Sequence, residues 1–222
     1  MEMIVYVISG LGADYKVLER LEFPEGFTVQ FIPWLMPQRN ETFESYTSRM
    51  AENIDDSKPF VLLGYSFGGI LVQEIHRIKP AVKVIILASL RSGKEKSVLL
   101  KVGSYTGITR LIPEGLFKNE SNYLYRYFRK LIASDHPRLN EYFTQRDPYY
   151  LKWSVENISR WNADPQDKVI QIMGDKDQVF PIKNCRPDFV IQGGTHLFPA
   201  TKSREVNKIL FSVLEKCKTL SI

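Results

Sequence analysis

The chain has 222 residues, of which 44% are hydrophobic and 25% charged, with a formal net charge of +5 at pH 7. This length suffices for one sizeable core, so we expect a single domain over residues 1–222. The apolar runs are far shorter than the roughly 20 residues that span a bilayer, and the N-terminus lacks the basic start of a signal peptide. We therefore expect a cytoplasmic protein without a membrane span.

The two cysteines and the charge distribution exclude further classes. Cys185 and Cys217 fit neither a metal-binding spacing nor a disulfide framework, so we expect free thiols in a reducing compartment. Residues 92–163 hold 12 Lys or Arg against 7 Asp or Glu, while the rest of the chain has 18 of each. This excess could attract anionic groups, but solvated helix faces explain it better. The basic residues form no RNA-binding motif, so nucleic acid is not an expected partner.

Short apolar, β-branched runs alternate with helical patterns along most of the chain, as is typical of a parallel sheet covered on both faces. The predicted strands are residues 3–9, 27–32, 60–65, 82–88, 168–173 and 189–191. The predicted helices are residues 13–20, 42–54, 67–79 and 203–216. This order predicts an α/β fold with a doubly wound, mostly parallel sheet of about six strands.

Residues 92–163 interrupt this alternation. They contain 12 of the 27 aromatic residues, several prolines and helical rather than strand-like spacing. We interpret them as a helical insertion. Within it, residues 121–132 place aromatic and aliphatic side chains on one helical face. That face could pack against the main domain or could act as a lid that walls an apolar pocket above the strand ends.

A GxSxG pattern ends the third predicted strand. The residues are Gly64-Tyr65-Ser66-Phe67-Gly68-Gly69, followed at once by an apolar helical segment. Such a strand-to-helix turn is typical of a nucleophile elbow, in which flanking glycines avoid collisions with neighbouring backbone and the serine hydroxyl stands clear. At the N-terminus of a helix, Ser66 also lies in the positive field of the helix dipole, which favours developing negative charge. Residues 103–107 also begin and end with glycine, but their central residue is tyrosine and no predicted strand precedes them, so we discard them as a nucleophile elbow.

A serine nucleophile needs a base that a third group orients. Of the three histidines, His76 falls inside the helix after the elbow and His136 precedes a proline in the insertion, so both favour structural roles. His196 follows Gly193 and Gly194 after the last strand and is the candidate base. The loop after the fifth strand offers Asp175 and Asp177 as candidate acids. One of the two is explained by the frequency of aspartate in turns.

The backbone N–H groups of Phe67, after the nucleophile, and Leu11, after the first strand, are the candidate oxyanion hole. The glycines that flank Leu11 allow backbone to approach a bound carbonyl closely. A tight strand-to-helix turn is the alternative explanation of these glycines. No metal-ligand pattern occurs, and the chemistry needs no metal or organic cofactor.

These residues together resemble the α/β-hydrolase family. The shared features are the GYSFGG elbow, the chain order Ser, Asp, His and a helical insertion after the strand that follows the elbow. The family often carries its acid in a GxxDxxxP loop, which Gly174, Asp177 and Pro181 match; the resemblance therefore implies Asp177 rather than Asp175. Many members begin the oxyanion loop with His-Gly, where this chain has Ser9-Gly10. The resemblance also implies a reduced sheet whose first strand corresponds to the family's third.

Two functions from different classes follow. The first is hydrolysis of a small-molecule carboxylic ester or thioester through an acyl-Ser66 intermediate, with His196 as general base and acid and Asp177 as the orienting acid. The second is a non-hydrolytic ligand-binding protein or a lyase on the same scaffold, because one fold can carry unrelated functions. The departure at Ser9 is the sequence feature that supports the second, and the complete set of three catalytic residue types favours the first.

Overall fold

The computed structural model describes residues 2–117 and 136–219. In this part of the chain, six strands form one sheet in the order β2-β1-β3-β4-β5-β6, and every neighbouring pair is parallel. The strands are β1 (Met3–Ile8), β2 (Phe27–Phe31), β3 (Phe60–Tyr65), β4 (Lys83–Leu87), β5 (Val169–Gly174) and β6 (Phe189–Ile191). The sheet confirms the predicted α/β fold class.

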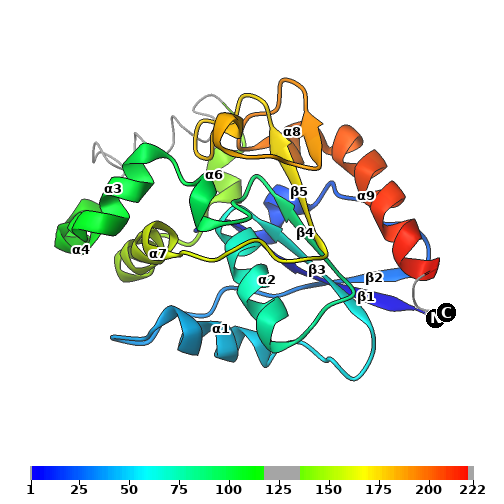
Figure 1. Cartoon of the computed structure of the whole chain (residues 1–222), viewed down its shortest axis with the longest axis horizontal. Coiled ribbons are helices and arrows are strands. Elements are labelled where there is room, and N and C mark those ends of the chain that lie inside the picture. The colour runs from blue at the N-terminus through cyan, green and yellow to red at the C-terminus, as the bar shows by residue number, and fades with distance from the viewer. Residues whose placement is uncertain (1, 118–135, 220–222) are drawn as a thin grey trace.

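Helices cover both faces of the sheet (Figure 1). The helices α1 (Phe43–Ala51) and α2 (Phe67–Ile78) pack on one face, and α9 (Ser203–Thr219) packs on the other. Successive strand residues alternate between the two cores, so that Leu62 joins the first and Leu63 the second. All six residues of β3 are buried. Burial on both faces is the reason why the strands appear as continuous apolar runs in the sequence.

The strand order reverses direction between β1 and β3. From β1 the chain passes to β2 on one side and then crosses to β3 on the other. In open parallel sheets, ligands bind at such a reversal, outside the carboxyl ends of the strands. The loop after β1 and the turn after β3 therefore meet at the position where the fold itself favours a site.

Between β4 and β5 the described residues form helical elements. These are two 3₁₀ helices (Gly93–Glu95 and Glu114–Phe117), α3 (Val98–Thr106), α4 (Ile108–Leu111), α6 (Leu139–Tyr142) and α7 (Pro148–Arg160). Residues 121–132, whose apolar face we predict to pack or to wall a pocket, lie outside the described residues. A lid function of residues 92–163 stays a prediction.

The predicted helix at residues 13–20 is wrong, because only a 3₁₀ helix forms there, at Tyr15–Leu18. Ala13 instead pairs with Phe143 in an antiparallel bridge, and the Asp14 N–H donates to the Tyr142 carbonyl at 2.7 Å. Asp14 is consequently extended, with φ −77° and ψ 164°. This pairing with the insertion excludes a helix that begins at Ala13, and periodicity along the chain carries no signal of it.

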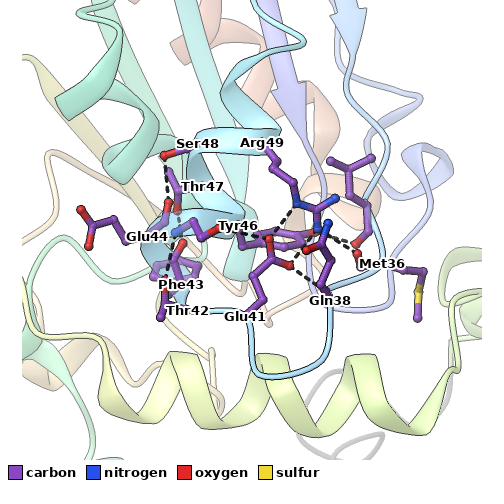
Figure 2. A network of polar contacts seen from close by, with 12 residues as sticks. Met36, Gln38, Glu41, Thr42, Phe43, Glu44, Tyr46, Thr47, Ser48 and Arg49 are labelled. Carbon is purple, nitrogen blue, oxygen red and sulfur yellow. Dashed lines mark hydrogen bonds and ion pairs between the residues drawn. The ribbon is translucent and has the colours of Figure 1, made fainter.

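The link between β2 and α1 is held by charged hydrogen bonds (Figure 2). The Arg49 guanidinium donates to both Glu41 carboxylate oxygens, at 2.7 and 2.8 Å, and to the Met36 carbonyl at 3.0 Å. The Glu41 side chain is only 2% exposed, and it also accepts from the Gln38 N–H at 2.7 Å. Hydrogen bonds from Arg49 lower the pKa of Glu41 below its ordinary value, although burial opposes this shift.

We expect Glu41→Gln to lower the free energy of unfolding at pH 7 by about 1–3 kcal/mol, because the partly buried negative charge is lost and one of the two oxygens that accept from Arg49 is replaced by an NH2 donor. A carboxylate with a lowered pKa stabilises the fold above the pKa of the unfolded chain, and this contribution disappears as pH falls through the folded pKa. The difference between wild type and variant should therefore shrink on acidification. Urea unfolding at pH 7 and at about pH 3 measures it.

Glu44→Gln is the matched control, because Glu44 is exposed in the first turn of the same helix. Its expected effect is a few tenths of a kcal/mol. A Glu41→Gln difference that stays constant down to pH 3 would contradict the proposed charge pairing.

Candidate active site

Ser66 lies on a sharp turn between β3 and α2. Its backbone has φ 52° and ψ −119°, a conformation that costs a residue with a side chain about 1–3 kcal/mol. The turn depends on two glycines. A Cβ on Gly64 would overlap the Gly68 carbonyl, and a Cβ on Gly68 would overlap the carbonyl oxygens of Ile8 and Ser9. The elbow is thus pressed directly against the end of β1.

His196 and Asp177 join Ser66 in one hydrogen-bonded chain. The His196 Nε2 lies 2.9 Å from the Ser66 Oγ, and its Nδ1 lies 2.8 Å from the Asp177 Oδ2. All three residues are buried, with exposed fractions of 8% for Ser66, 4% for Asp177 and 2% for His196. Ser66 and His196 are 130 residues apart in the sequence, so the parallel sheet brings them together.

The Asp177 carboxylate is fixed by its own loop. Its Oδ1 accepts hydrogen bonds from the backbone N–H groups of Val179 and Phe180, at 2.8 and 2.9 Å, which leaves Oδ2 directed at His196. Asp175 occupies a different environment: its Oδ1 is buried without a partner in the described part of the chain. Of the two candidate acids, the structure brings Asp177 to the histidine.

Two aromatic residues hold the His196 loop. The Tyr65 hydroxyl donates to the His196 carbonyl at 3.1 Å, and the Phe180 ring meets the imidazole edge-on at 5.6 Å between centroids. Burial raises the pKa of Tyr65 well above its ordinary value, and the Asp177 charge adds to this shift, so the hydroxyl keeps its proton. Tyr65 is not among the site residues predicted from the sequence. Its position just before Ser66 on a fully buried strand is the available signal, since a buried hydroxyl needs a partner.

The loop after β1 lies beside the nucleophile. A Cβ on Gly10 would be 3.1 Å from the Ser66 Cβ. Residues 10–13 form a β-turn closed by the Ala13 N–H on the Gly10 carbonyl at 2.9 Å, with Gly12 at φ 68°. Such a turn leaves the N–H of its second residue, Leu11, unused. Within the described residues, neither the Leu11 nor the Phe67 N–H donates to an acceptor.

The Ser9 side chain supports this turn, since its hydroxyl donates to the Ala13 carbonyl at 2.5 Å. Ser9 therefore stabilises the turn that carries the Leu11 N–H.

The other two histidines have local backbone partners. The His76 Nδ1 accepts from the Ala81 N–H at 2.9 Å, and burial lowers the pKa of His76. The His136 Nδ1 accepts from the Arg138 N–H at 3.3 Å. Both contacts agree with the structural roles expected for them.

A groove of about 820 Å³ runs between residues 39–43, α4 and α7. None of Ser66, Asp177 and His196 lines it. It carries both charge signs, with the cations contributed by Arg39, Arg110, Lys152 and Arg160. Among residues 2–117 and 136–219, no cluster of His, Cys, Asp or Glu could hold a metal ion, and no helix is both long and apolar enough to cross a membrane.

Comparison with known proteins establishes the fold. No protein-family model matches the sequence, and no curated protein matches it either. Solved structures, in contrast, match the fold of this chain over nearly its whole length. A thermophilic esterase from Thermogutta terrifontis superposes with a TM-score of 0.73 at 15% identity, covering 98% of this chain and 91% of the esterase. The chain has the α/β-hydrolase fold.

Two further structures extend the range of similar proteins. A lipase-esterase related protein from Clostridium acetobutylicum gives a TM-score of 0.65 at 16% identity, covering 93% of this chain and 92% of that one. YbtT, a type II thioesterase from the yersiniabactin pathway, gives 0.60 at 12% identity, covering 97% and 94%. The structural neighbours thus include esterases and thioesterases.

We expect Gly68→Ala to destabilise the protein by about 1–3 kcal/mol, because the new methyl group would have to displace the end of β1 from the elbow. Gly115→Ala is the control, since a Cβ there meets nothing within 4 Å. Thermal unfolding of both variants tests the contact. Equal melting temperatures for the two variants would show that the elbow tolerates a side chain at residue 68.

Proposed function

We propose that the protein is a serine hydrolase that cleaves a small-molecule carboxylic ester or thioester through an acyl-Ser66 intermediate. The observation that carries the proposal is the hydrogen-bonded chain from Ser66 Oγ through His196 to Asp177, with distances of 2.9 and 2.8 Å. Such a chain is what a weakly nucleophilic alcohol requires for attack on a carbonyl carbon. The esterase and thioesterase neighbours support the same reaction class.

In the proposed first half-reaction, the Ser66 Oγ bonds to the substrate carbonyl carbon while its proton passes to the His196 Nε2. Asp177 holds the Nδ1–H tautomer and stabilises the imidazolium that forms. The Leu11 and Phe67 N–H groups bind the oxygen as it becomes negative. When the tetrahedral species collapses, the bond to the alcohol or thiol breaks and His196 gives this leaving group its proton.

In the second half-reaction, His196 takes a proton from water as the water oxygen attacks the acyl-Ser66 carbonyl. Collapse releases the carboxylic acid and returns the proton to the Ser66 Oγ. Every proton transfer in this cycle is assigned to a residue of the chain. A cytoplasmic location is part of the proposal, supported by Cys185 and Cys217, neither of which forms a disulfide.

A fluorophosphonate probe should label the wild-type protein, and Ser66→Ala should remove the label. The probe phosphonylates an activated serine and releases fluoride, so labelling reports the nucleophile without knowledge of the substrate. Intact mass spectrometry measures it. A label that persists on Ser66→Ala would contradict the assignment. A folded wild-type protein with no label, no burst and no turnover of p-nitrophenyl esters would instead support a non-hydrolytic function.

We expect Asp177→Asn to lower kcat by roughly 10⁴, because an amide favours the wrong imidazole tautomer. Asp175→Asn, two residues away on the same loop, should keep kcat within about threefold. Steady-state kinetics on p-nitrophenyl esters and on thioesters of increasing acyl length provide the comparison and define the preferred acyl group. A larger loss at Asp175 than at Asp177 would reverse the assignment of the acid.

A further inference from the structure

One side chain outside the Ser66, His196 and Asp177 chain contacts both segments of the candidate oxyanion hole. Trp34 lies on the link between β2 and α1 and is partly buried. Its indole Nε1–H donates to the Gly10 carbonyl at 3.0 Å. Its ring stacks on the Phe67 ring, with 5.2 Å between centroids and an interplanar angle of 8°.

The hydrogen bond from Trp34 to the Gly10 carbonyl orients the Leu11 N–H. The Gly10 carbonyl and the Leu11 N–H belong to one planar trans peptide, in which C=O and N–H point in opposite directions. A donor that holds the carbonyl therefore also sets the direction of the N–H. The Ala13 N–H holds the same oxygen at 2.9 Å, so two donors, one local and one from the distant link, orient this peptide.

The stacking of Trp34 on Phe67 affects the second backbone donor, the Phe67 N–H. The Phe67 ring stacks on Trp34 and also on Phe43, with 5.8 Å between the Phe43 and Phe67 centroids and an interplanar angle of 22°. The Phe67 N–H is the first of α2 and follows Ser66 directly. By holding this ring, Trp34 restricts the residue whose backbone would supply the other half of the oxyanion hole.

The position of Trp34 is itself fixed from neighbouring residues. The Tyr46 hydroxyl donates to the Leu35 carbonyl at 2.8 Å, and Arg49 donates to the Met36 carbonyl at 3.0 Å (Figure 2). The bidentate Arg49 to Glu41 pair closes the same link. Trp34 is thus presented on an anchored segment, which is what a residue needs in order to hold another peptide in place.

We propose that Trp34 is a positioning residue of the oxyanion hole: its indole N–H orients the Gly10–Leu11 peptide and its ring holds Phe67, so that both backbone donors face the reacting oxygen at Ser66. The inference rests on the proposed hydrolase function and deepens it. Trp34 acts through the backbone and has no proton-transfer role. Its effect is expected on the charged transition state and not on ground-state binding.

The test compares Trp34→Phe with wild type on p-nitrophenyl esters. Phenylalanine keeps an aromatic ring for the stack but removes the N–H. We expect kcat to fall about tenfold with KM within about twofold; complete loss of a donor costs roughly 10²–10³, and here the Ala13 N–H still holds the carbonyl. The affinity for an alkyl trifluoromethyl ketone, whose adduct with Ser66 carries an oxyanion, should fall by the same factor. The pH profile of kcat/KM should keep its shape, since His196 and Asp177 are untouched.

Trp153→Phe is the matched control. The Trp153 indole belongs to the same aromatic cluster and also donates to a backbone carbonyl, that of Glu41 at 2.9 Å, but it makes no hydrogen bond to residues 9–13. Its kcat and ketone affinity should stay within twofold of wild type. A second variant with 3-benzothienylalanine at position 34, in which sulfur replaces the N–H, removes the donor with almost no change of shape and should reproduce the loss of Trp34→Phe.

Several outcomes would overturn the inference. These are wild-type kcat and ketone affinity in the benzothienylalanine variant, equal losses in the Trp34 and Trp153 variants, or a loss that appears in KM alone. Wild-type protein that fluorophosphonate does not label would instead reject the hydrolase proposal, and Trp34 with it. Normal labelling and turnover of wild type with an unaffected Trp34 variant would reject the role of Trp34 alone.

Discussion

The close approach of the elbow to the end of β1 is the constraint on which the rest of the site depends. With glycine at residue 68, α2 can begin against the Ile8 and Ser9 carbonyls, and with glycine at residue 10, the following turn can lie over the Ser66 Cβ. This contact holds Ser66 in a backbone conformation that a residue with a side chain otherwise avoids. Because β1 and β3 are the parallel neighbours between which the strand order reverses, the same contact brings the nucleophile and the Leu11 N–H together.

Much of this arrangement could be predicted from the sequence, because the relevant signals are local. Apolar runs such as residues 60–65 reveal buried parallel strands, and Pro80 marks the end of α2 one residue after its extended C-cap, Lys79. Ser66 is predicted by the GxSxG pattern, and the loops that carry Asp177 and His196 are predicted by their places after strands. In a parallel sheet, the carboxyl ends of all strands share one edge, so the topology alone brings such loops together.

What could not be predicted depends on contacts between distant segments. The helix expected at residues 13–20 is replaced by pairing of Ala13 with Phe143, and no pattern near residue 13 signals that partner. Trp34 was likewise unremarkable in the sequence, since its importance lies in an indole that reaches Gly10, 24 residues away. The choice of Asp177 over Asp175 also needed coordinates or family spacing, because both residues suit a turn equally well.

The pairing of residues 13–14 with the insertion has a mechanical consequence. The Asp14 N–H binds the Tyr142 carbonyl, the Gln145 N–H binds the Gly12 carbonyl at 3.1 Å, and a Cβ on Gly12 would crowd the Gln145 carbonyl at 2.8 Å. Residues 142–145 therefore hold the turn that carries the Leu11 N–H in place through two backbone hydrogen bonds and one close contact. Any movement of residues 142–145 away from the sheet must either break these two hydrogen bonds or pull the turn with it. The geometry around Ser66 is therefore coupled to a segment that makes no hydrogen bond to the serine among the described residues.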